Sequence, residues 1–237
     1  MGTHSLFDIV GPIMVGPSSS HTAGAARLGL LARAIYGGQP RRADILLHGS
    51  FAATGDGHGT KLALVAGLLG FAPDDLRIPR ALDLAREQHM DVTFGEVSLE
   101  TAHPNTAVFN LSGGVVGEED GQVVATDPDL AQRMRIEGCS VGGGAVEVTH
   151  IDDFEVSATG DLPLIVVEHT DQPGVIHFVS GVLSESRINI AGMRVSREMR
   201  GARALMLIET DGAPDRVTLS RMLKQPQVHS VRYVPSI

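Results

Sequence analysis

Apolar and polar positions alternate most regularly in the last third of the chain. They predict four strands and two helices, over residues 162–169 (strand), 174–186 (helix), 188–196 and 203–210 (strands), 214–223 (helix) and 228–234 (strand). The order is βαββαβ. In about 75 residues, this order gives a four-stranded antiparallel sheet with two helices on one face.

The first two thirds of the chain are less regular. Apolar spacing predicts helices over 22–36, 60–71 and 79–88, and strands over 44–51, 91–99, 106–112, 121–126 and 145–156. The segment Gly-Glu-Glu-Asp-Gly at 117–121 is expected to join two of these strands as a hairpin loop. The predicted fold class is therefore α+β.

Charge is divided unevenly between these two regions. Residues 1–155 carry a net charge of −10 and residues 156–237 carry +1. The segment 157–161, Ser-Ala-Thr-Gly-Asp, is small and polar, as expected of a boundary. We therefore expect two domains, at 1–158 and 161–237.

The whole-chain composition excludes several classes of partner. The net charge of −9 disfavours nucleic acid and anionic membrane surfaces. No apolar run approaches the roughly 20 residues of a membrane span, and no secretory signal is visible. The single cysteine, Cys139, excludes an intrachain disulfide. These features favour a cytoplasmic protein.

The segment 7–22 has the most specific chemistry. Gly-Pro occurs twice, at 11–12 and 16–17, and Ser-Ser-Ser-His-Thr at 18–22 then crowds the start of the first helix. Serine and threonine cap free N–H groups there, and the positive end of the helix dipole favours an anion. Five hydroxyl or imidazole residues in a row exceed what capping requires, so the segment predicts a binding site.

Three further segments combine glycine with polar residues. They are 48–60, which delivers His58 to a helix start, 101–107 (Thr-Ala-His-Pro-Asn-Thr-Ala) and 137–144 (Glu-Gly-Cys-Ser-Val-Gly-Gly-Gly). The first lacks the Gly-Lys-Ser/Thr ending of a P-loop. Taken singly, each is equally typical of a loop, with His58 an exposed loop histidine.

Together, in this order, the four segments resemble the iron–sulfur-dependent L-serine dehydratases. The resemblance covers essentially the whole chain and is to the beta chain of the type with separate subunits. Its first domain is similar to the allosteric-substrate-binding domain of phosphoglycerate dehydrogenases. Residues 161–237, with Asp-Gln-Pro-Gly-Val at 171–175 and Ile-Asn-Ile at 188–190, resemble an ACT domain.

The resemblance implies a lyase of amino-acid catabolism and gluconeogenesis that converts L-serine to pyruvate and ammonia. It implies a 4Fe–4S cluster, which normally takes several cysteine thiolates. Cys139 alone cannot hold one, so the cluster is expected on a partner alpha chain, with no metal ligand in this chain. His21 and His58 are the candidate catalytic residues, because a histidine at a helix start stays neutral and can accept a proton; base and acid are not distinguished. Ser18, Ser19, Ser20 and Thr22 could bind the substrate carboxylate or orient the imidazole, and His103 and Asn105 are further candidates for substrate binding.

The ACT resemblance implies self-association and an allosteric ligand. Asp171 and Asn189 match the positions that hold an amino acid, here L-serine, at the contact between two copies. The helix 174–187 is expected to present Val175, Val179 and Val182 to the partner. Alternatively, Asp171 only makes the turn and Asn189 only ends the helix.

Two other functions were weighed against a catalytic subunit. A non-catalytic serine sensor is the main alternative, since related domains are described as regulatory. A Ser-His hydrolase is disfavoured because Ser20 and His21 are sequence neighbours, a poor geometry for a nucleophile and its base, and no nucleophile elbow is present.

Overall fold

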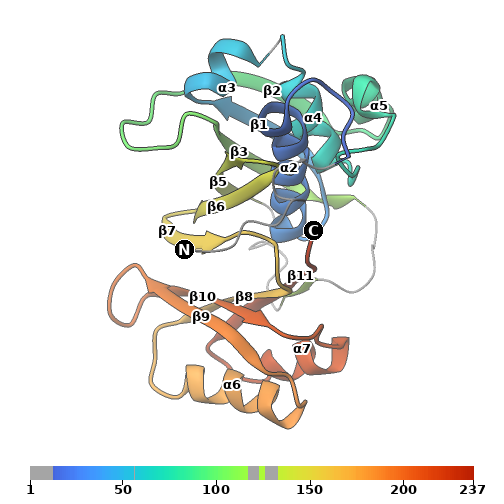
Figure 1. Ribbon diagram of the computed structural model, residues 1–237. Helices are drawn as coiled ribbons and strands as arrows, with labels where there is room; N and C mark the ends of the chain where they lie inside the picture. Colours follow the sequence, from blue (N-terminus) through green and yellow to red (C-terminus); the bar gives the residue numbers. More distant parts are fainter. Residues whose placement is uncertain (1–12, 56, 117–122, 126–132) are drawn as a thin grey trace, which may run out of the picture.

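A computed structural model describes residues 13–55, 57–116, 123–125 and 133–237 of the chain (Figure 1). Its helices and strands are arranged around two separate sheets, one of six strands and one of five. The predicted α+β class is confirmed. The first sheet carries most of the first region, and the second sheet carries the βαββαβ unit at the end of the chain.

The six-stranded sheet has the order β2-β1-β3-β5-β6-β7. Strands β1 and β2 are parallel, and every other neighbouring pair is antiparallel. The strands are β1 (Gln39–Leu47), β2 (Asp91–Glu96), β3 (Thr106–Val116), β5 (Arg133–Gly142), β6 (Ala145–Ile151) and β7 (Phe154–Ala158).

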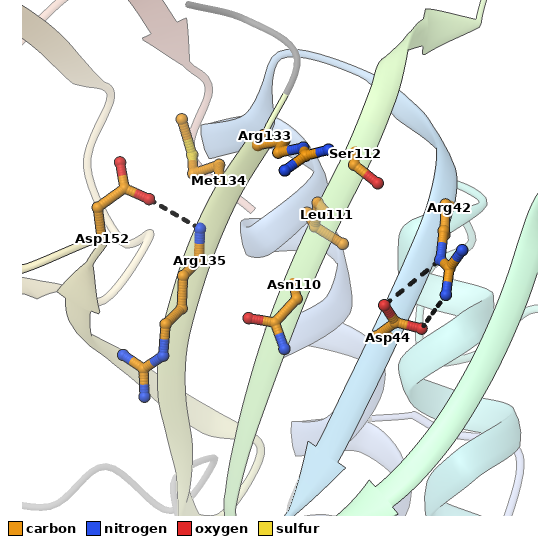
Figure 2. Close-up of a pocket in the computed structure, with 9 residues that line it drawn as sticks. All are labelled: Arg42, Asp44, Asn110, Leu111, Ser112, Arg133, Met134, Arg135 and Asp152. Carbon is orange, nitrogen blue, oxygen red and sulfur yellow. Dashed lines mark hydrogen bonds and ion pairs between the residues drawn. The ribbon is translucent and has the colours of Figure 1, made fainter.

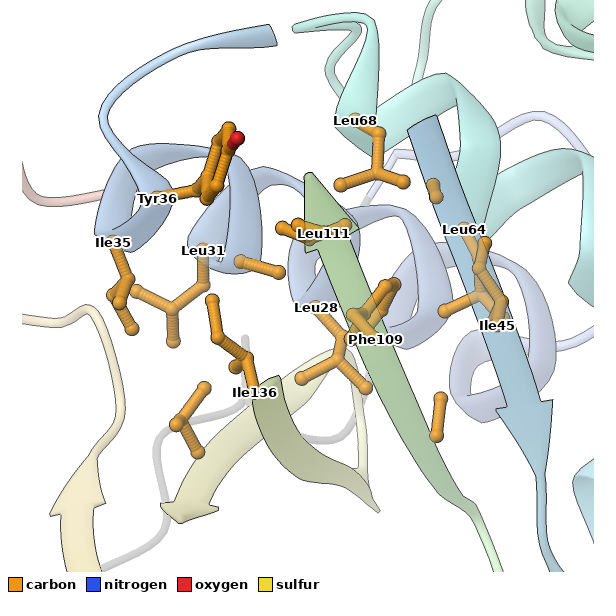
Figure 3. Packing of buried hydrophobic residues seen from close by; sticks show 14 of the residues in the cluster. Leu28, Leu31, Ile35, Tyr36, Ile45, Leu64, Leu68, Phe109, Leu111 and Ile136 are labelled. Atoms are coloured by element: carbon orange, nitrogen blue, oxygen red, sulfur yellow. The ribbon is translucent and has the colours of Figure 1, made fainter. Parts of the chain in front are cut away.

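Helices cover one face of this sheet. Leu28 and Leu31 of the long helix α2 pack against Phe109 and Ile136 of the sheet, all fully buried (Figure 3). Helix α4 packs on α2 so closely that a Cβ at Gly29 would lie 2.3 Å from the carbonyl oxygen of Leu64. The helices of this region are η1 (Ser19–Ala23, a π-helix), α2 (Gly24–Tyr36), α3 (Gly49–Thr54), α4 (Thr60–Leu68), η2 (Ile78–Arg80, 3₁₀) and α5 (Ala81–Glu87).

Several strand predictions in this region had wrong boundaries. The strand expected over 91–99 ends at Glu96, and the strand expected over 106–112 continues to Val116. The strand expected over 44–51 ends at Leu47, because Gly49 adopts a left-handed φ of 57° and its successor donates to the carbonyl of Pro104. The strand expected over 145–156 is two strands, β6 and β7, separated by a turn in which Asp152 has a φ of 50°. Strand β5 was not predicted from the sequence.

The second sheet has the order β4-β11-β8-β10-β9 and is antiparallel throughout. Helices α6 and α7 form a buried cluster against one face of it. The elements are β8 (Leu164–Thr170), α6 (Val175–Glu185), β9 (Ile190–Arg197), β10 (Arg203–Thr210), α7 (Arg216–Met222) and β11 (Val228–Val234), so the predicted βαββαβ order is observed.

The fifth strand, β4 (Val123–Ala125), comes from the first region and pairs with β11. The strand expected over 121–126 therefore does not form a hairpin with β3, because it has a different partner in another sheet. The loop expected at 117–121 lies outside the described residues.

The free face of the second sheet packs against the first region. Side chains from this face belong to the same buried apolar cluster as α2 and the six-stranded sheet. They are Leu164, Val166, Leu205, Leu207 and Val234.

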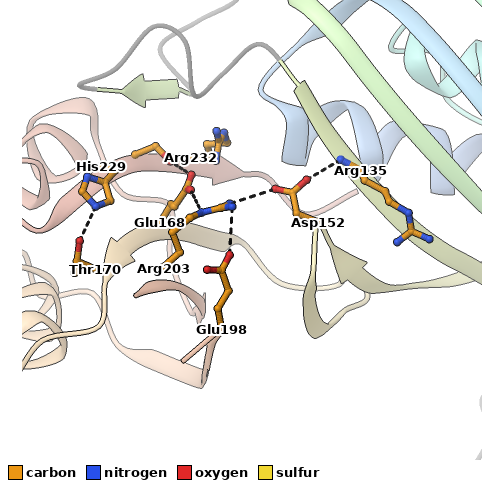
Figure 4. Close-up of polar contacts among 9 residues, drawn as sticks. Arg135, Asp152, Glu168, Thr170, Glu198, Arg203, His229 and Arg232 are labelled. Carbon is orange, nitrogen blue, oxygen red and sulfur yellow. Dashed lines mark hydrogen bonds and ion pairs between the residues drawn. The ribbon is translucent and has the colours of Figure 1, made fainter. Parts of the chain in front are cut away.

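Polar contacts surround this junction (Figure 4). Arg203 of β10 lies 3.1 Å from Glu168, 3.3 Å from Glu198 and 3.7 Å from Asp152. Asp152 belongs to the first region, where it also accepts a hydrogen bond from the backbone N–H of Arg135. Arg203 thus joins the two sheets through its ion pairs.

Candidate functional site

The serine-rich segment begins the first helix one turn earlier than expected. Ser19–Ala23 forms a π-helical turn that leads directly into α2. Ser18 caps it, since its Oγ accepts a hydrogen bond of 3.2 Å from the backbone N–H of His21. Gly24 permits the close approach of this turn to β5, because a Cβ there would lie 2.0 Å from the Oγ of Ser140.

The π-turn places His21 between two hydroxyl groups. Its Nδ1 lies 3.1 Å from Ser20 Oγ, and its Nε2 lies 3.0 Å from Ser50 Oγ at the start of α3. The edge of the ring meets Phe51 at a centroid distance of 5.3 Å. The imidazole is therefore fixed on both nitrogens and along one edge.

His58 lies beside His21, with ring centroids 5.1 Å apart and ring planes at 47°. Its Nδ1 is 3.2 Å from the carbonyl oxygen of Thr54. Thr22 is buried, and its hydroxyl donates to the carbonyl oxygen of His58. The first and second segments are thus joined at the two histidines.

The surroundings of His21 favour its neutral form. Burial lowers the pKa of His21, and the neighbouring His58 lowers it further. Both effects penalise the imidazolium, by desolvation and by like-charge repulsion. A neutral imidazole retains one nitrogen that can accept a proton.

The third segment adjoins the start of α3. The carbonyl oxygen of Pro104 accepts a 2.7 Å hydrogen bond from the backbone N–H of Ser50. His103 and Asn105 flank Pro104. His103 is exposed, and its Nδ1 accepts a hydrogen bond from the backbone N–H of Asn105. The loop therefore brings His103 and Asn105 to the element that holds His21.

The fourth segment supports the third from β5. The backbone N–H of Ser140 donates to the carbonyl of Asn105, and the side-chain amide of Asn105 donates to the carbonyl of Ser140. Ser140 also meets Gly24 at the start of α2. All four segments that the sequence singled out therefore converge on one place, which we call the helix-mouth site.

The predicted serine and threonine side chains differ in their contacts with the two histidines. Ser18, Ser20 and Thr22 contact the two histidines or their backbone, whereas no hydrogen bond of the Ser19 side chain is found within the described residues. Ser50 was not among the residues predicted for the site. Its signal was available in the His-Gly-Ser run at 48–50, which precedes a helix in the same way as the first segment.

Asp171 and Asn189 lie apart within one copy of the chain. They flank α6, whose 11 residues span about 16 Å. Asp171 accepts hydrogen bonds from Arg197 and from the backbone N–H of Gly201, which lower its pKa, and Asn189 donates to Asp211. A small amino acid cannot bridge both ends of this helix in a single copy.

The expectation that α6 presents three valines to a partner is wrong. Val175, Val179 and Val182 are at most 4% exposed, because they pack in the cluster between α6 and the second sheet. Apolar side chains that are exposed in this part include Ile176 on α6 and Met193 and Val195 on the edge strand β9.

The lone cysteine does not fit a cluster ligand. Cys139 is buried in β5, and burial raises the pKa of its thiol to about 11, so it is not a thiolate at neutral pH. Among the described residues, no group of three or more His, Cys, Asp or Glu side chains is placed to hold a metal ion. No helix in the described part of the chain is long and apolar enough to cross a membrane.

Known proteins are similar to this chain in sequence. Residues 5–150 match the family described as serine dehydratase beta chain. The chain is 40% identical over 231 residues to the probable L-serine dehydratase beta chain of Bacillus subtilis (strain 168), covering 98% of each. It is 34% identical over 237 residues to the L-serine dehydratase beta chain of Peptoniphilus asaccharolyticus, covering 99% of each.

A more distant similarity reaches another class of enzyme. The D-3-phosphoglycerate dehydrogenase of Synechocystis sp. is 22% identical over 187 residues, which are 79% of this chain and 31% of that enzyme. The similarity therefore extends over part of the dehydrogenase only.

Proposed function

The chain belongs to the serine dehydratase beta chain family, and from that premise we propose that its helix-mouth site carries out the proton transfers of L-serine dehydration. It is thus a subunit of L-serine dehydratase, a lyase. The observation that carries the proposal is the pair of imidazoles of His21 and His58, 5.1 Å apart, on which the four segments converge.

The reaction removes water from serine in a defined order of proton movements. A base takes the Cα proton, and the β-hydroxyl accepts a proton and leaves as water. The enamine that remains is hydrolysed to pyruvate and ammonia. The Cα proton is weakly acidic, so the base must be held close to it in the bound substrate.

We assign the base to His58. Its Nδ1 faces the carbonyl oxygen of Thr54, which can only accept a hydrogen bond, so Nδ1 carries the hydrogen. This tautomer leaves the lone pair on Nε2 to take the Cα proton. The hydrogen bond from Thr22 to the backbone of His58 holds the loop in place, which makes Thr22 a positioning residue.

His21 is assigned to the leaving hydroxyl. It is neutral, and its two nitrogens are bonded to Ser20 and Ser50, so it can donate a hydrogen bond without carrying a charge. The proton that His58 takes from Cα is passed to the departing oxygen, so water leaves and both imidazoles are neutral again after the elimination. Repulsion between two protonated rings disfavours a second imidazolium during this transfer.

The serine carboxylate is assigned to the start of the helix. The π-turn and α2 together form 18 helical residues, whose N-terminal N–H groups attract an anion. Ser19 and Ser20 lie in this turn, and His103 and Asn105 line the adjoining loop. We propose that these four residues contact the substrate.

The 4Fe–4S cluster is assigned to the alpha chain. A buried thiol with a pKa of about 11 is a poor ligand, and a cluster normally takes several thiolates.

We further propose that residues 161–237 form an ACT domain that binds L-serine between two copies of the chain. The βαββαβ order and the similarity to a phosphoglycerate dehydrogenase support it. Because Asp171 and Asn189 flank α6, only contact between two copies brings Asp171 of one to Asn189 of the other. Asp171, ionised by its contacts with Gly201 and Arg197, would pair with the amino group.

The catalytic assignment is tested with His21→Ala and His58→Ala, each reconstituted with the alpha chain. Each is expected to lose at least roughly 10²-fold in turnover while the iron content stays normal. With serine deuterated at Cα, His58→Ala is expected to show the larger isotope effect, because proton abstraction becomes rate-limiting. If both variants retain near-normal turnover, the chain acts as a sensor instead.

A further inference from the structure

The outer face of the six-stranded sheet, away from α2, carries a hollow of about 440 Å³ (Figure 2). Side chains along each strand alternate between the two faces. Leu111 and Met134 point into the buried cluster under α2, so their neighbours Ser112 and Arg133 point to the outer face. The lining of the hollow is mainly polar and charged.

The strand register arranges this lining in two rows. Arg42 of β1 and Arg133 of β5 both pair with Ser112 of β3, which lies between them. In the next row, Asn110 lies between Asp44 and Arg135 in the same way. Directly opposite residues on neighbouring strands have Cβ atoms about 5 Å apart, so the first row forms a continuous Arg-Ser-Arg array.

The carboxylates around the hollow already have partners. Asp44 accepts a short hydrogen bond from Thr93 and pairs with Arg42 at 3.4 Å. Asp152 accepts from the backbone N–H of Arg135 and lies 3.7 Å from Arg203. Arg42 contacts Asp44 through both Nε and Nη2, each at 3.4 Å, and its other N–H groups remain available to a ligand.

Arg133 differs from the other two arginines of the hollow in its charge partners. Within the described part of the chain it makes no ion pair, whereas Arg135 pairs with Glu137 at 2.8 Å. Figure 2 shows the guanidinium of Arg133 reaching from β5 toward Ser112. Arg42 pairs with Asp44 and Arg135 pairs with Glu137, so Arg133 is the guanidinium of this lining that is open to an anion.

We propose that this hollow binds the phosphoryl group of a small phosphate monoester, seated over Ser112 between Arg42 and Arg133. A phosphoryl group has three terminal oxygens, which match two guanidinium forks and one hydroxyl from three neighbouring strands. A carboxylate has only two oxygens for these three donors. The remaining volume accommodates the rest of a small molecule, next to Asn110.

The hollow is distinct from the helix-mouth site. The helix-mouth site adjoins Asn105 at the start of β3, whereas Ser112 lies near the other end of the same strand. Seven residues of extended chain separate them, which is about 23 Å. A phosphate monoester in the hollow would therefore not compete with L-serine for the helix-mouth site.

Calorimetry on the full chain at fixed ionic strength tests the proposal, with inorganic phosphate, methyl phosphate and succinate as separate titrants. We expect saturable binding of both phosphates and weaker binding of succinate. Arg133→Ala is expected to weaken phosphate binding by about tenfold or more, and Arg133→Lys by less, since it keeps the charge but loses the fork. Ser112→Ala is expected to weaken it by several-fold.

Arg216→Ala is the matched control, since Arg216 is an exposed arginine at the start of helix α7, which packs on the other sheet. It is expected to bind phosphate as the unaltered chain does. Thermal denaturation checks that each variant is folded. Arg133 is exposed, so its replacement should leave the stability of the fold unchanged. The proposal is overturned if neither phosphate binds saturably, if Arg133→Ala and Arg216→Ala behave alike, or if succinate binds as tightly as methyl phosphate.

Discussion

The Nε2 atom of His21 lies 3.0 Å from the Oγ atom of Ser50, although 29 positions separate the two residues in the chain. One comes from the π-turn before α2 and the other from the first turn of α3. The start of α3 is in turn fixed to the loop at Pro104 by a 2.7 Å backbone hydrogen bond. The orientation of the His21 imidazole thus depends on three separate segments.

Ser50→Ala is expected to lower serine turnover by roughly tenfold, because the imidazole of His21 loses one of its two orienting hydrogen bonds. Steady-state kinetics of the reconstituted enzyme measure it. Ser50→Thr, which keeps the hydroxyl, should restore most of the activity. A Ser50→Ala enzyme with unaltered kcat and an unaltered pH profile would show that Ser50 has no part in orienting the ring.

The pKa of His21 should rise when its neighbour is made neutral. Burial is the main cause of its lowered pKa and remains in His58→Asn, so the pKa is expected to rise but to stay below its ordinary value. NMR titration of the His21 ring protons in both chains measures the change. A pKa that does not move would contradict the coupling between the two rings.

The same lowered pKa predicts how stability depends on pH. Below about pH 6.5 the unfolded chain takes up a proton at His21 that the folded chain does not. The contribution of neutral His21 to the free energy of unfolding is therefore fully present above about pH 6.5. It is lost as the pH falls toward the lowered pKa that His21 has in the folded chain. Thermal denaturation of the unaltered chain and of His21→Asn between pH 5 and 8 should show a smaller loss in the variant.

The chain purified alone should contain no iron–sulfur cluster and should not deaminate serine. Cys139 is its single cysteine, and burial keeps it protonated. Cys139→Ala, reconstituted with the alpha chain, should retain the full iron content by elemental analysis. A stoichiometric cluster on the isolated chain would contradict the assignment to the alpha chain.

A chain that ends at residue 158 is expected to fold, but with reduced stability. The cut removes five apolar side chains from the cluster shared with α2, including Val166 and Leu207, and removes the strand that pairs with β4. Urea denaturation followed by circular dichroism measures the loss. In the full chain, Leu207→Ala should cost about 2–5 kcal/mol. An unfolded spectrum of the shortened chain would mean that the two regions fold only together.

Self-association through the edge of the second sheet predicts that Val195→Lys yields a smaller species in sedimentation. Val195 and Met193 are each exposed by more than a third on the edge strand β9, and edge strands are templates for pairing. A charge there opposes the contact between two copies. Arg216→Ala, on α7, is the control, and a full chain that sediments as a monomer before any substitution would remove this contact.

L-Serine should give binding heat with the isolated chain that Asp171→Ala abolishes, because the carboxylate of Asp171 is the proposed partner of the amino group. D-Serine is the ligand control. Asp161→Ala is the matched variant, since Asp161 is an exposed acid outside this contact. Heat that persists unchanged in Asp171→Ala would place serine elsewhere, with the helix-mouth site the first alternative.

The sequence by itself determined the second region and the four segments that meet at the helix-mouth site. Strands β10 and β11 have the predicted bounds, since in each a regular run of apolar residues is closed by polar or turn residues. The four polar segments were also identified from sequence, because glycine, serine and histidine at a helix start have chemical consequences that need no tertiary contact.

Only the tertiary structure decided which segments pair and which side chains meet. β5 was missed because its Gly-Cys-Ser-Val-Gly run has no clear period, yet it is held by hydrogen bonds to β3 and β6 on either side. β4 joins a strand more than 100 residues away in the other sheet. The contact of His21 with Ser50 and the Arg-Ser-Arg row over Ser112 arise from the same cause. Each depends on strand and helix partners that are distant in the chain, which local preferences do not encode.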